Sequence, residues 1–259
     1  MKKLGLALGA GGSRGVAHIG FLQALEEEGI YPDFISGSSM GSVVGAAYAA
    51  GVDIKTMKDA VRKLRWLDLL AIAGKRGGVF GTRKMRSLLQ RYIGDISFSD
   101  LKIPFTCVAV DMCSQSLVEF SQGSVLDAIV ASSSIPAVFH PLEKDGMRLI
   151  DGGVLERVPV REVKNMGADI VVAVDVIGQK QCSEECPGIV GVLQETIDIM
   201  DNYRTRRKRE ENQKIIDFWL EPDLGMMSQY EIKQVDFAYV KGYELGKQNV
   251  EAIRKALKR

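Results

Sequence analysis

A short pattern near the start of the chain places a serine where it could act as a nucleophile. Residues 37–41 read Gly-Ser-Ser-Met-Gly, which fits Gly-x-Ser-x-Gly. In a sharp turn between a strand and a helix, this pattern projects its central hydroxyl from the edge of a sheet at the N-terminus of the helix. Ser39 holds the central position, whereas Ser38 is offset by one residue and Ser42 falls inside the predicted helix. We therefore predict that Ser39 is the nucleophile of an acyl-transfer reaction.

A glycine-rich loop, residues 9–15 with the sequence Gly-Ala-Gly-Gly-Ser-Arg-Gly, precedes the first predicted helix. Glycines let the backbone approach a ligand closely, and the start of a helix presents free N–H groups. The loop therefore predicts binding of an anion, either permanent or developing during a reaction. It is similar to the dinucleotide fingerprint, but Arg14 occupies the sixth position from Gly9, and no acidic residue ends the second predicted strand. A nucleotide site is the alternative interpretation.

Histidine, the usual base of serine hydrolases, is scarce in this chain. There are two histidines, His18 in the first predicted helix and His140 in a loop. In the α/β-hydrolase order the histidine comes late in the chain, after the acid, and no histidine follows His140. Either one could act as a base by its chemistry. We expect both to be structural and the base to be a carboxylate.

Aspartates end three apolar segments that are predicted strands, namely Asp111, Asp151 and Asp175. An aspartate at such a position is often only a turn former or a helix cap. Asp151 differs because Gly152 and Gly153 follow it, and they let the chain turn sharply and leave the carboxylate at the rim of the sheet. Asp151 is therefore the candidate base.

Taken together, residues 10–15, 37–41 and 151–153 resemble the three signature blocks of the patatin-like phospholipases. Their order and spacing match, and the resemblance covers most of residues 1–180. The serine-rich segment 132–136, which ends in proline, is similar to a further segment of that family. The chain is similar to the small, bacterial, single-domain members.

The resemblance implies an α/β fold, a three-layer α/β/α sandwich with a mostly parallel central sheet. It implies catalysis by a Ser-Asp dyad without histidine, cofactor or metal, with Ser39 as nucleophile and Asp151 as base. The residues that it implies for the oxyanion hole and substrate binding lie in the glycine loop and directly after the nucleophile: Gly11, Gly12, Ser13, Arg14 and Met40.

Two positions depart from the family pattern. Ala10 stands where the family has the first glycine of the loop, which is a minor change if the backbone φ stays negative. Arg157 stands where the family often has an asparagine that supports the loop of the aspartate. An arginine there leaves a dyad feasible but puts the orientation of Asp151 in question.

The implied activity is that of a serine esterase or lipid acyl hydrolase of the phospholipase A or lysophospholipase type, acting on a lipid or another acyl ester. Two alternatives fit the same residues: an acyltransferase or thioesterase that uses the same dyad, and a regulatory binding protein with little turnover. The residues do not determine the head group, the acyl-chain length or the positional preference.

Composition places the chain among ordinary globular proteins. Of its 259 residues, 46% are apolar and 26% are charged, which excludes disorder and a coiled-coil rod. The net charge of +1 argues against a nucleic-acid partner. The apolar run after Lys3 is too short for a signal peptide, and no apolar segment is long enough to span a membrane. We expect one domain over residues 1–259 in a cytoplasmic setting, of undetermined oligomeric state.

Apolar periodicity predicts strands that alternate with helices, and hence a mostly parallel sheet with helices on both faces. The predicted strands cover residues 3–8, 34–36, 105–110, 117–121, 148–150, 170–176 and 215–220. The predicted helices cover residues 15–29, 40–50, 56–70, 82–92, 125–131, 190–209 and 233–257.

Two helical segments have a second interpretation as membrane contacts. The helix at 56–70 carries an apolar stripe with Trp66 and basic residues beside it; the stripe faces the core or, alternatively, lies peripherally on the inner face of a membrane. The basic run 204–209 is a solvated helix face or, second, a patch for anionic lipid. Cys182 and Cys186 lack further ligands nearby, so we expect no metal site.

Overall fold

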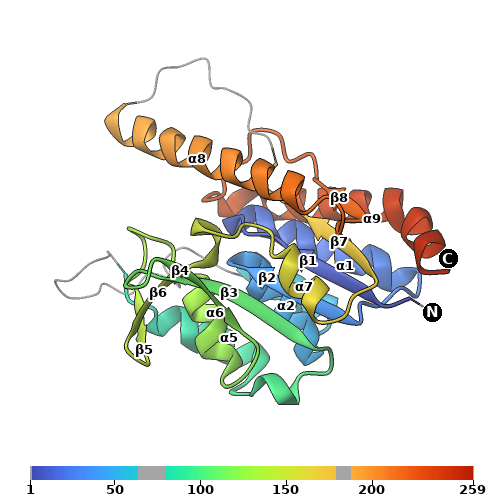
Figure 1. Ribbon diagram of the computed structural model, residues 1–259, viewed down its shortest axis with the longest axis horizontal. Coiled ribbons are helices and arrows are strands. Elements are labelled where there is room, and N and C mark those ends of the chain that lie inside the picture. Colours follow the sequence, from blue (N-terminus) through green and yellow to red (C-terminus); the bar gives the residue numbers. More distant parts are fainter. Residues whose placement is uncertain (1, 64–79, 179–187, 259) are drawn as a thin grey trace.

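A central β-sheet with helices on both faces forms the protein (Figure 1). The computed structural model describes residues 2–63, 80–178 and 188–258. The strands are β1 (Leu4–Leu8), β2 (Phe34–Ser38), β3 (Phe105–Asp111), β4 (Ser116–Phe120), β5 (Leu142–Lys144), β6 (Met147–Asp151), β7 (Ile170–Val174) and β8 (Phe218–Leu220).

The α-helices are α1 (Ala17–Glu27), α2 (Met40–Ala50), α3 (Ile54–Lys63), α5 (Arg83–Ile93), α6 (Val125–Ser132), α7 (Val160–Asn165), α8 (Ile189–Glu211) and α9 (Val235–Lys258). Short 3-10 helices are η1 (Gly12–Val16), η2 (Phe98–Asp100), η3 (Gly152–Val154) and η4 (Ile232–Gln234).

The sheet has the strand order β5-β6-β3-β2-β1-β7-β8, and β4 pairs with β3. Strands β3, β2, β1, β7 and β8 run parallel, as the alternation of strands and helices predicted. In contrast, β4, β5 and β6 pair antiparallel. Short turns join β3 to β4 and β5 to β6, and a short turn can join only antiparallel strands.

Strand β3 pairs with both β2 and β6 along one edge. Ser38, the last residue of β2, lies opposite Val108, and Asp151, the last residue of β6, lies opposite the next residue, Ala109. At Val108 and Ala109, the opposite edge of β3 pairs with β4. Because β2 runs parallel to β3 and β6 runs antiparallel to it, the carboxyl ends of β2 and β6 meet.

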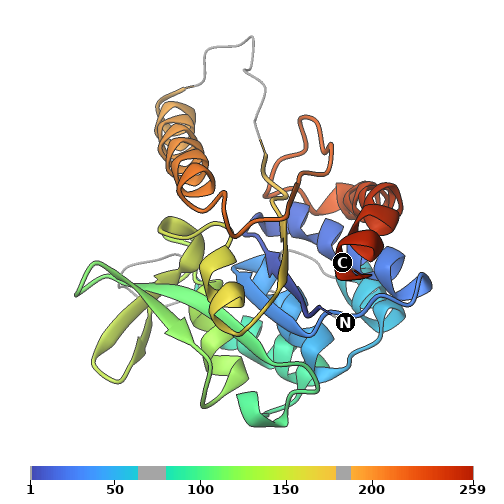
Figure 2. The ribbon, with the colours of Figure 1, turned by 45° about the vertical axis from the view of Figure 1, so that its right-hand side comes forward.

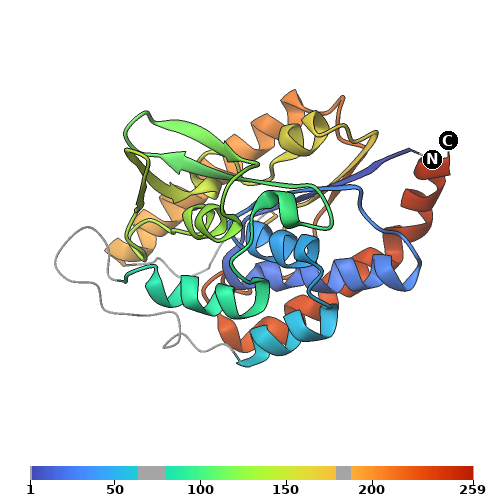
Figure 3. The ribbon, with the colours of Figure 1, turned by 90° about the horizontal axis from the view of Figure 1, so that it is seen from below.

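Alternating side chains along the strands divide the core between the two faces of the sheet. Leu6 and Leu8 of β1 belong to the larger cluster, together with residues of α1, α2 and α6. Ala7 points to the other face, where it belongs to a smaller cluster with Val163 of α7 and Val171 of β7. Figure 3 shows α3, α5 and α9 on one side of the sheet and α7 and α8 on the other. The fold is the three-layer α/β/α sandwich that the sequence predicted.

Helices α1 and α9 lie side by side at very short range (Figure 3). The contact depends on glycines, because a Cβ on Gly242 of α9 would lie 1.8 Å from the carbonyl oxygen of Ala17. A Cβ on Gly20 of α1 would lie 2.0 Å from the carbonyl oxygen of Tyr239. The C-terminal helix is thereby held against the helix that follows the glycine loop.

Some element boundaries differ from those predicted, for local reasons. The first helix begins at Ala17, later than predicted, because the 3-10 helix η1 occupies the preceding residues. Helix α3 begins at Ile54, earlier than predicted, because the carboxylate of Asp53 accepts a hydrogen bond from the amide of Thr56. The strand predicted from residue 215 is reduced to β8, and α7 and β5 were not predicted.

Other predictions fall on residues that are only partly described. Within α3, Ile54 and Met57 are buried, so this part of the apolar stripe faces the core. Trp66, Cys182 and Cys186 lie outside the described residues. None of the helices in the described ranges combines the length and the apolar character that crossing a membrane requires.

Replacing Gly242 by alanine tests the close packing of α1 on α9. Helix propensity alone would favour the variant by about 1 kcal/mol, but the clash with the Ala17 carbonyl should lower the free energy of unfolding by about 1–3 kcal/mol. Urea unfolding measures the difference. Gln248→Ala, at an exposed position of the same helix, is the matched control and should change stability by less than about 0.5 kcal/mol. Equal stability of the two variants would contradict the close contact.

Candidate active site

The turn between β2 and α2 is sharp and strained at Ser39. Its backbone has φ 51° and ψ −124°, a conformation that non-glycine residues rarely adopt. A Cβ on Gly37 would lie 2.5 Å from the Cα of Ser42, and one on Gly41 would lie 2.1 Å from the carbonyl oxygen of Leu8. Both glycines of the pattern are therefore required, and the turn presents the Ser39 hydroxyl at the N-terminus of α2.

The hydroxyl of Ser39 donates a hydrogen bond of 2.5 Å to Oδ2 of Asp151. The other carboxylate oxygen, Oδ1, accepts a hydrogen bond of 2.8 Å from the amide of Gly153. Both side chains are buried. The meeting of β2 and β6 on one edge of β3 thus brings together two residues that are 112 positions apart in the sequence.

Two serines at the C-terminal end of α6, Ser132 within the helix and Ser134 just after it, hold the backbones of this pair. The hydroxyl of Ser132 accepts a hydrogen bond of 2.9 Å from the amide of Ser39. The amide of Asp151 donates a hydrogen bond of 3.0 Å to the carbonyl of Ser134. The serine-rich segment singled out in the sequence therefore contacts both halves of the site.

Burial raises the pKa of Asp151 to about 7. The hydrogen bonds from Ser39 and Gly153 lower this pKa, and the negative charge of Asp201 raises it further, but desolvation is the largest effect. A carboxylate with such a pKa is a far better proton acceptor than an ordinary aspartate, whose pKa is about 3.9. It can take the proton of a serine hydroxyl that attacks an acyl carbon.

Four amides of the glycine loop have partners within the protein. Gly9 and Ala10 donate to the carbonyls of Val174 and Arg157, at 3.0 and 2.9 Å. The amide of Ser13 donates a hydrogen bond of 2.8 Å to the carbonyl of Gln229. The amide of Arg14 donates one of 3.1 Å to the carbonyl of Gly11.

Three amides near Ser39 have no acceptor among the described residues. They are those of Gly11 and Gly12 in the glycine loop and that of Met40, the residue after Ser39. Gly11 and Gly12 lie at the start of η1, and Met40 begins α2. Gly15 lets the two elements approach, since a Cβ there would lie 2.4 Å from the side chain of Met40. These amides could stabilise the oxyanion that forms on a carbonyl oxygen when Ser39 attacks the carbonyl carbon.

The side chain of Arg14 has a role that sequence reasoning missed. Its guanidinium donates to three backbone carbonyls, those of Val176, Ile177 and Met227, at 2.7, 3.0 and 2.9 Å. It therefore ties the glycine loop to the segment after β7 and to the loop after β8. The pattern in the sequence could not reveal this, because the acceptors are backbone groups more than 160 residues away.

Two other candidates, His18 and Asp111, are engaged elsewhere. His18 is fully buried, its Nε2 lies 2.8 Å from the carbonyl oxygen of Gly9, and burial lowers its pKa to about 4, so it stays neutral. Asp111 accepts hydrogen bonds from the hydroxyl and the amide of Ser114 and from the amide of Cys113 in the turn after β3, and these bonds lower its pKa, that from the Ser114 hydroxyl most. His140 is half-buried in the loop before β5.

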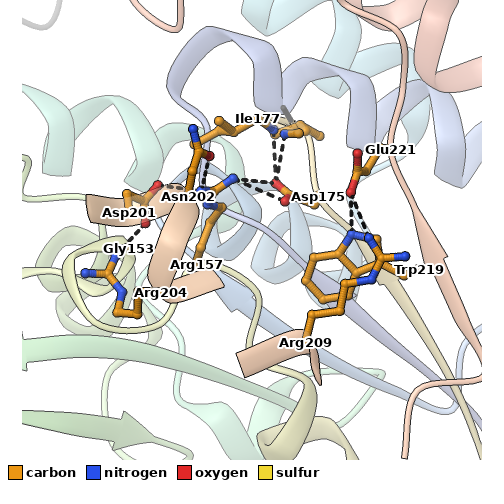
Figure 4. Close-up of polar contacts among 12 residues, drawn as sticks. Gly153, Arg157, Asp175, Ile177, Asp201, Asn202, Arg204, Arg209, Trp219 and Glu221 are labelled. Atoms are coloured by element: carbon orange, nitrogen blue, oxygen red, sulfur yellow. Dashed lines mark hydrogen bonds and ion pairs between the residues drawn. The ribbon is translucent and has the colours of Figure 1, made fainter. Parts of the chain in front are cut away.

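Arg157, where the family pattern has asparagine, is buried and lies at the centre of a polar network (Figure 4). Its guanidinium lies 3.2 Å from Asp175, 2.9 Å from Asp201 and 2.6 Å from the side-chain oxygen of Asn202. Asp201 also pairs with Arg204. The guanidinium of Arg204 donates a hydrogen bond of 2.9 Å to the carbonyl of Gly153.

This network connects α8 to the loop that orients Asp151. The carbonyl of Gly153 accepts from Arg204, while the amide of the same residue holds the Asp151 carboxylate. Asp201 was not singled out in the sequence, and Arg204 was interpreted only as part of the basic run 204–209, a solvated face or a patch for anionic lipid, whereas its guanidinium binds Asp201 and the carbonyl of Gly153. Arg157 therefore supports the aspartate loop through α8 and leaves the hydrogen bond between Ser39 and Asp151 intact.

A cavity of about 190 Å³ opens beside Ser39, and its walls are almost wholly apolar. Side chains from α2, α3 and α5 line it, including Val43, Ala60 and Leu89. Gln229 and Tyr230 line it near the glycine loop. Such walls favour a hydrocarbon chain over a polar group, because polar groups would lose their hydration without new partners.

Comparison with protein families matches residues 6–164 to the family described as patatin-like phospholipase. An uncharacterized NTE family protein of Mycobacterium tuberculosis is 37% identical over 180 residues, which cover 69% of this chain and 50% of that protein. The neuropathy target esterase of Drosophila melanogaster is 33% identical, over 68% of this chain and 13% of that protein.

Lysophospholipase nte1 of Aspergillus fumigatus is 32% identical over 190 residues, which cover 68% of this chain and 12% of that protein. The chain thus spans half or less of the length of these relatives. Among solved structures, VipD from Legionella pneumophila superposes with a TM-score of 0.65 at 15% identity, over 97% of this chain and 67% of that one. The type III effector ExoU superposes with a TM-score of 0.54 at 14% identity, over 97% and 53%. These structures share the fold.

The raised pKa of Asp151 predicts a pH-dependent reactivity of Ser39. Below pH 7 the carboxylate is protonated and cannot accept the serine proton, so the rate of labelling by a fluorophosphonate probe should rise as the pH increases through about 7. Peptide mapping should find the label on Ser39 and not on Ser38 or Ser42. A rate that is flat between about pH 5 and 8 would contradict the role of Asp151 as base.

Proposed function

Because the chain belongs to the patatin-like phospholipase family, we propose that it is a lipid acyl hydrolase with Ser39 and Asp151 as its catalytic dyad. The observation that carries the proposal is the hydrogen bond of 2.5 Å from Ser39 to Asp151, beside an apolar cavity. A buried carboxylate with a raised pKa next to a strained serine is an arrangement suited to acyl transfer.

In the first step, Ser39 Oγ attacks the ester carbonyl carbon while Asp151 accepts the hydroxyl proton. The C–O bond to the alcohol then breaks, and Asp151 returns the proton to the departing oxygen, which leaves an acyl-enzyme on Ser39. In the second step, Asp151 accepts a proton from water, the water oxygen attacks the acyl-enzyme, and the fatty acid leaves as Ser39 regains its proton.

The oxyanion of each tetrahedral intermediate needs donors that are in place beforehand. The sequence implied the amides of residues 11–14 and of Met40 for this role. We assign it to Gly11, Gly12 and Met40, because the amides of Ser13 and Arg14 already have acceptors within the protein. One such donor commonly contributes about 2.7–4 kcal/mol to stabilisation of the transition state.

The substrate that we propose is a lysophospholipid or a comparable lipid with a single acyl chain. The cavity beside Ser39 is small and apolar, which suits one hydrocarbon chain and leaves the head group outside. The name lysophospholipase of one relative agrees with this choice. An acyltransferase or thioesterase would use the same dyad, and incubation with glycerol or another acceptor alcohol would reveal it by a transacylated product.

Substitution of either dyad residue should abolish hydrolysis without unfolding the protein. We expect Ser39→Ala and Asp151→Asn each to lower the rate for a lysophospholipid and for p-nitrophenyl butyrate by about a thousandfold or more. His140→Gln is the control and should keep the wild-type rate. Circular dichroism checks the fold. Full activity of either dyad variant, or loss of activity in folded His140→Gln, would contradict the mechanism.

Narrowing the cavity should change the preference for acyl-chain length. Ala60 lines the cavity from the half-exposed side of α3, so Ala60→Phe should fill part of the space without opening the core. We expect kcat/KM for a long-chain ester to fall by about tenfold, and that for an acetate ester to change by less than about twofold. Equal losses for both esters would show that the acyl chain binds elsewhere.

A further inference from the structure

Helix α8 carries its apolar side chains on the side that faces solvent. Its apolar residues recur at spacings of three and four, which places them along one face of the helix. Their exposed fractions lie between 48% and 85%, and no described residue covers them. The stripe consists of Ile189, Val192, Leu193, Ile197, Ile199, Met200 and Tyr203.

The polar side of the same helix faces the protein. Asp201, Asn202 and Arg204 point to the loop of residues 152–157 and bind Arg157 and the carbonyl of Gly153 (Figure 4). Lys208 pairs with Glu156 of that loop. A helix on a soluble domain normally buries its apolar side. The reverse orientation of α8 indicates that the stripe is used for contact with something apolar.

The stripe lies on the same side of the molecule as the loop after β8, which lines the cavity beside Ser39 (Figure 2). Burial raises the pKa of Tyr230, and the charges of Asp198 on α8 and of Asp151 raise it further, so both carboxylates lie near this phenol. Tyr230 lines the apolar cavity. Figure 2 shows that α8 and the loop after β8 extend to the same side of the molecule, and Met226 in that loop is 59% exposed.

The composition along α8 changes from apolar to aromatic to basic. The exposed apolar residues occupy its N-terminal half, Tyr203 follows, and Arg206 and Arg207 come next on the exposed side. The guanidinium of Arg206 lies over the Tyr203 ring, 6.0 Å from its centre. A lipid surface has the same order from acyl chains to anionic head groups, and aromatic side chains gather at the boundary.

From these observations we infer that the exposed stripe of α8 is the surface by which the protein docks on a lipid bilayer. The N-terminal half enters the boundary between head groups and acyl chains, and the arginines contact phosphates. Docking places the entrance of the cavity against the bilayer, so that a lipid can reach Ser39 without crossing water. The inference rests on the proposed function only in that the substrate is a lipid.

Vesicle binding in the inactive Ser39→Ala background tests the docking surface apart from catalysis. The probe is unilamellar vesicles of phosphatidylcholine with phosphatidylglycerol. Replacing Leu193, Ile197 and Met200 by glutamine, which keeps helix propensity, should lower the partition coefficient by more than about tenfold. The matched control replaces three exposed apolar residues outside α8, Tyr31, Phe237 and Val240, and should bind as Ser39→Ala does.

With Ser39 restored, the α8 variant should hydrolyse p-nitrophenyl butyrate within about twofold of the wild-type rate, since the dyad is unchanged. Its hydrolysis of lipid in vesicles should fall in parallel with its vesicle binding.

Unchanged vesicle binding of the α8 variant would overturn the inference. So would sedimentation velocity showing that the stripe joins two copies of the chain. Binding without dependence on phosphatidylglycerol would contradict the part assigned to Arg206 and Arg207. A wrong assignment of the dyad would be detected independently of vesicle binding, because Ser39→Ala would then still hydrolyse the ester.

Discussion

The candidate active site depends on one constraint, the pairing of two strands with the same edge of β3. Strand β2 ends at Ser38, opposite Val108, and β6 ends at Asp151, opposite Ala109. Because the two strands run toward each other, the residue after one strand meets the last residue of the other. A shift of one residue in the β6 register would turn the Asp151 side chain to the opposite face of the sheet, and the same shift in the β2 register would displace Ser39 from it. The hydrogen bond between Ser39 and Asp151 is therefore a consequence of sheet register.

The residues around this hydrogen bond stabilise two features that are energetically unfavourable on their own. Ser39 has a backbone conformation with positive φ, and Asp151 is a buried carboxylate. Close packing at Gly37 and Gly41 leaves the turn no room to relax. The amide of Gly153 and the charged residues of α8 fix the aspartate loop, while burial keeps the pKa of Asp151 near neutrality. Arg157 is compatible with the site because Asp175 and Asp201 compensate its buried charge.

The local parts of this arrangement could be predicted from the sequence, and the long-range parts could not. Glycine spacing identified the turn at Ser39, and the scarcity of histidine together with the glycines after Asp151 identified the second residue of the pair. The antiparallel direction of β6 left no signal, because a five-residue strand reads the same in either direction. The partner of the Ser13 amide is the carbonyl of Gln229, a backbone group that any residue provides. The residues of α8 that hold the loop read as part of a charged surface helix.

The central claim is that burial beside Ser39 turns an ordinary aspartate into a base. The most direct test is the titration of Asp151 itself, followed by carbon-13 NMR of its carboxyl carbon in labelled protein. The account predicts a midpoint near 7 and, in Ser39→Ala, a higher midpoint, because the hydrogen bond from the serine hydroxyl lowers this pKa in the wild type. A midpoint at the ordinary value of about 3.9 in both proteins would contradict it.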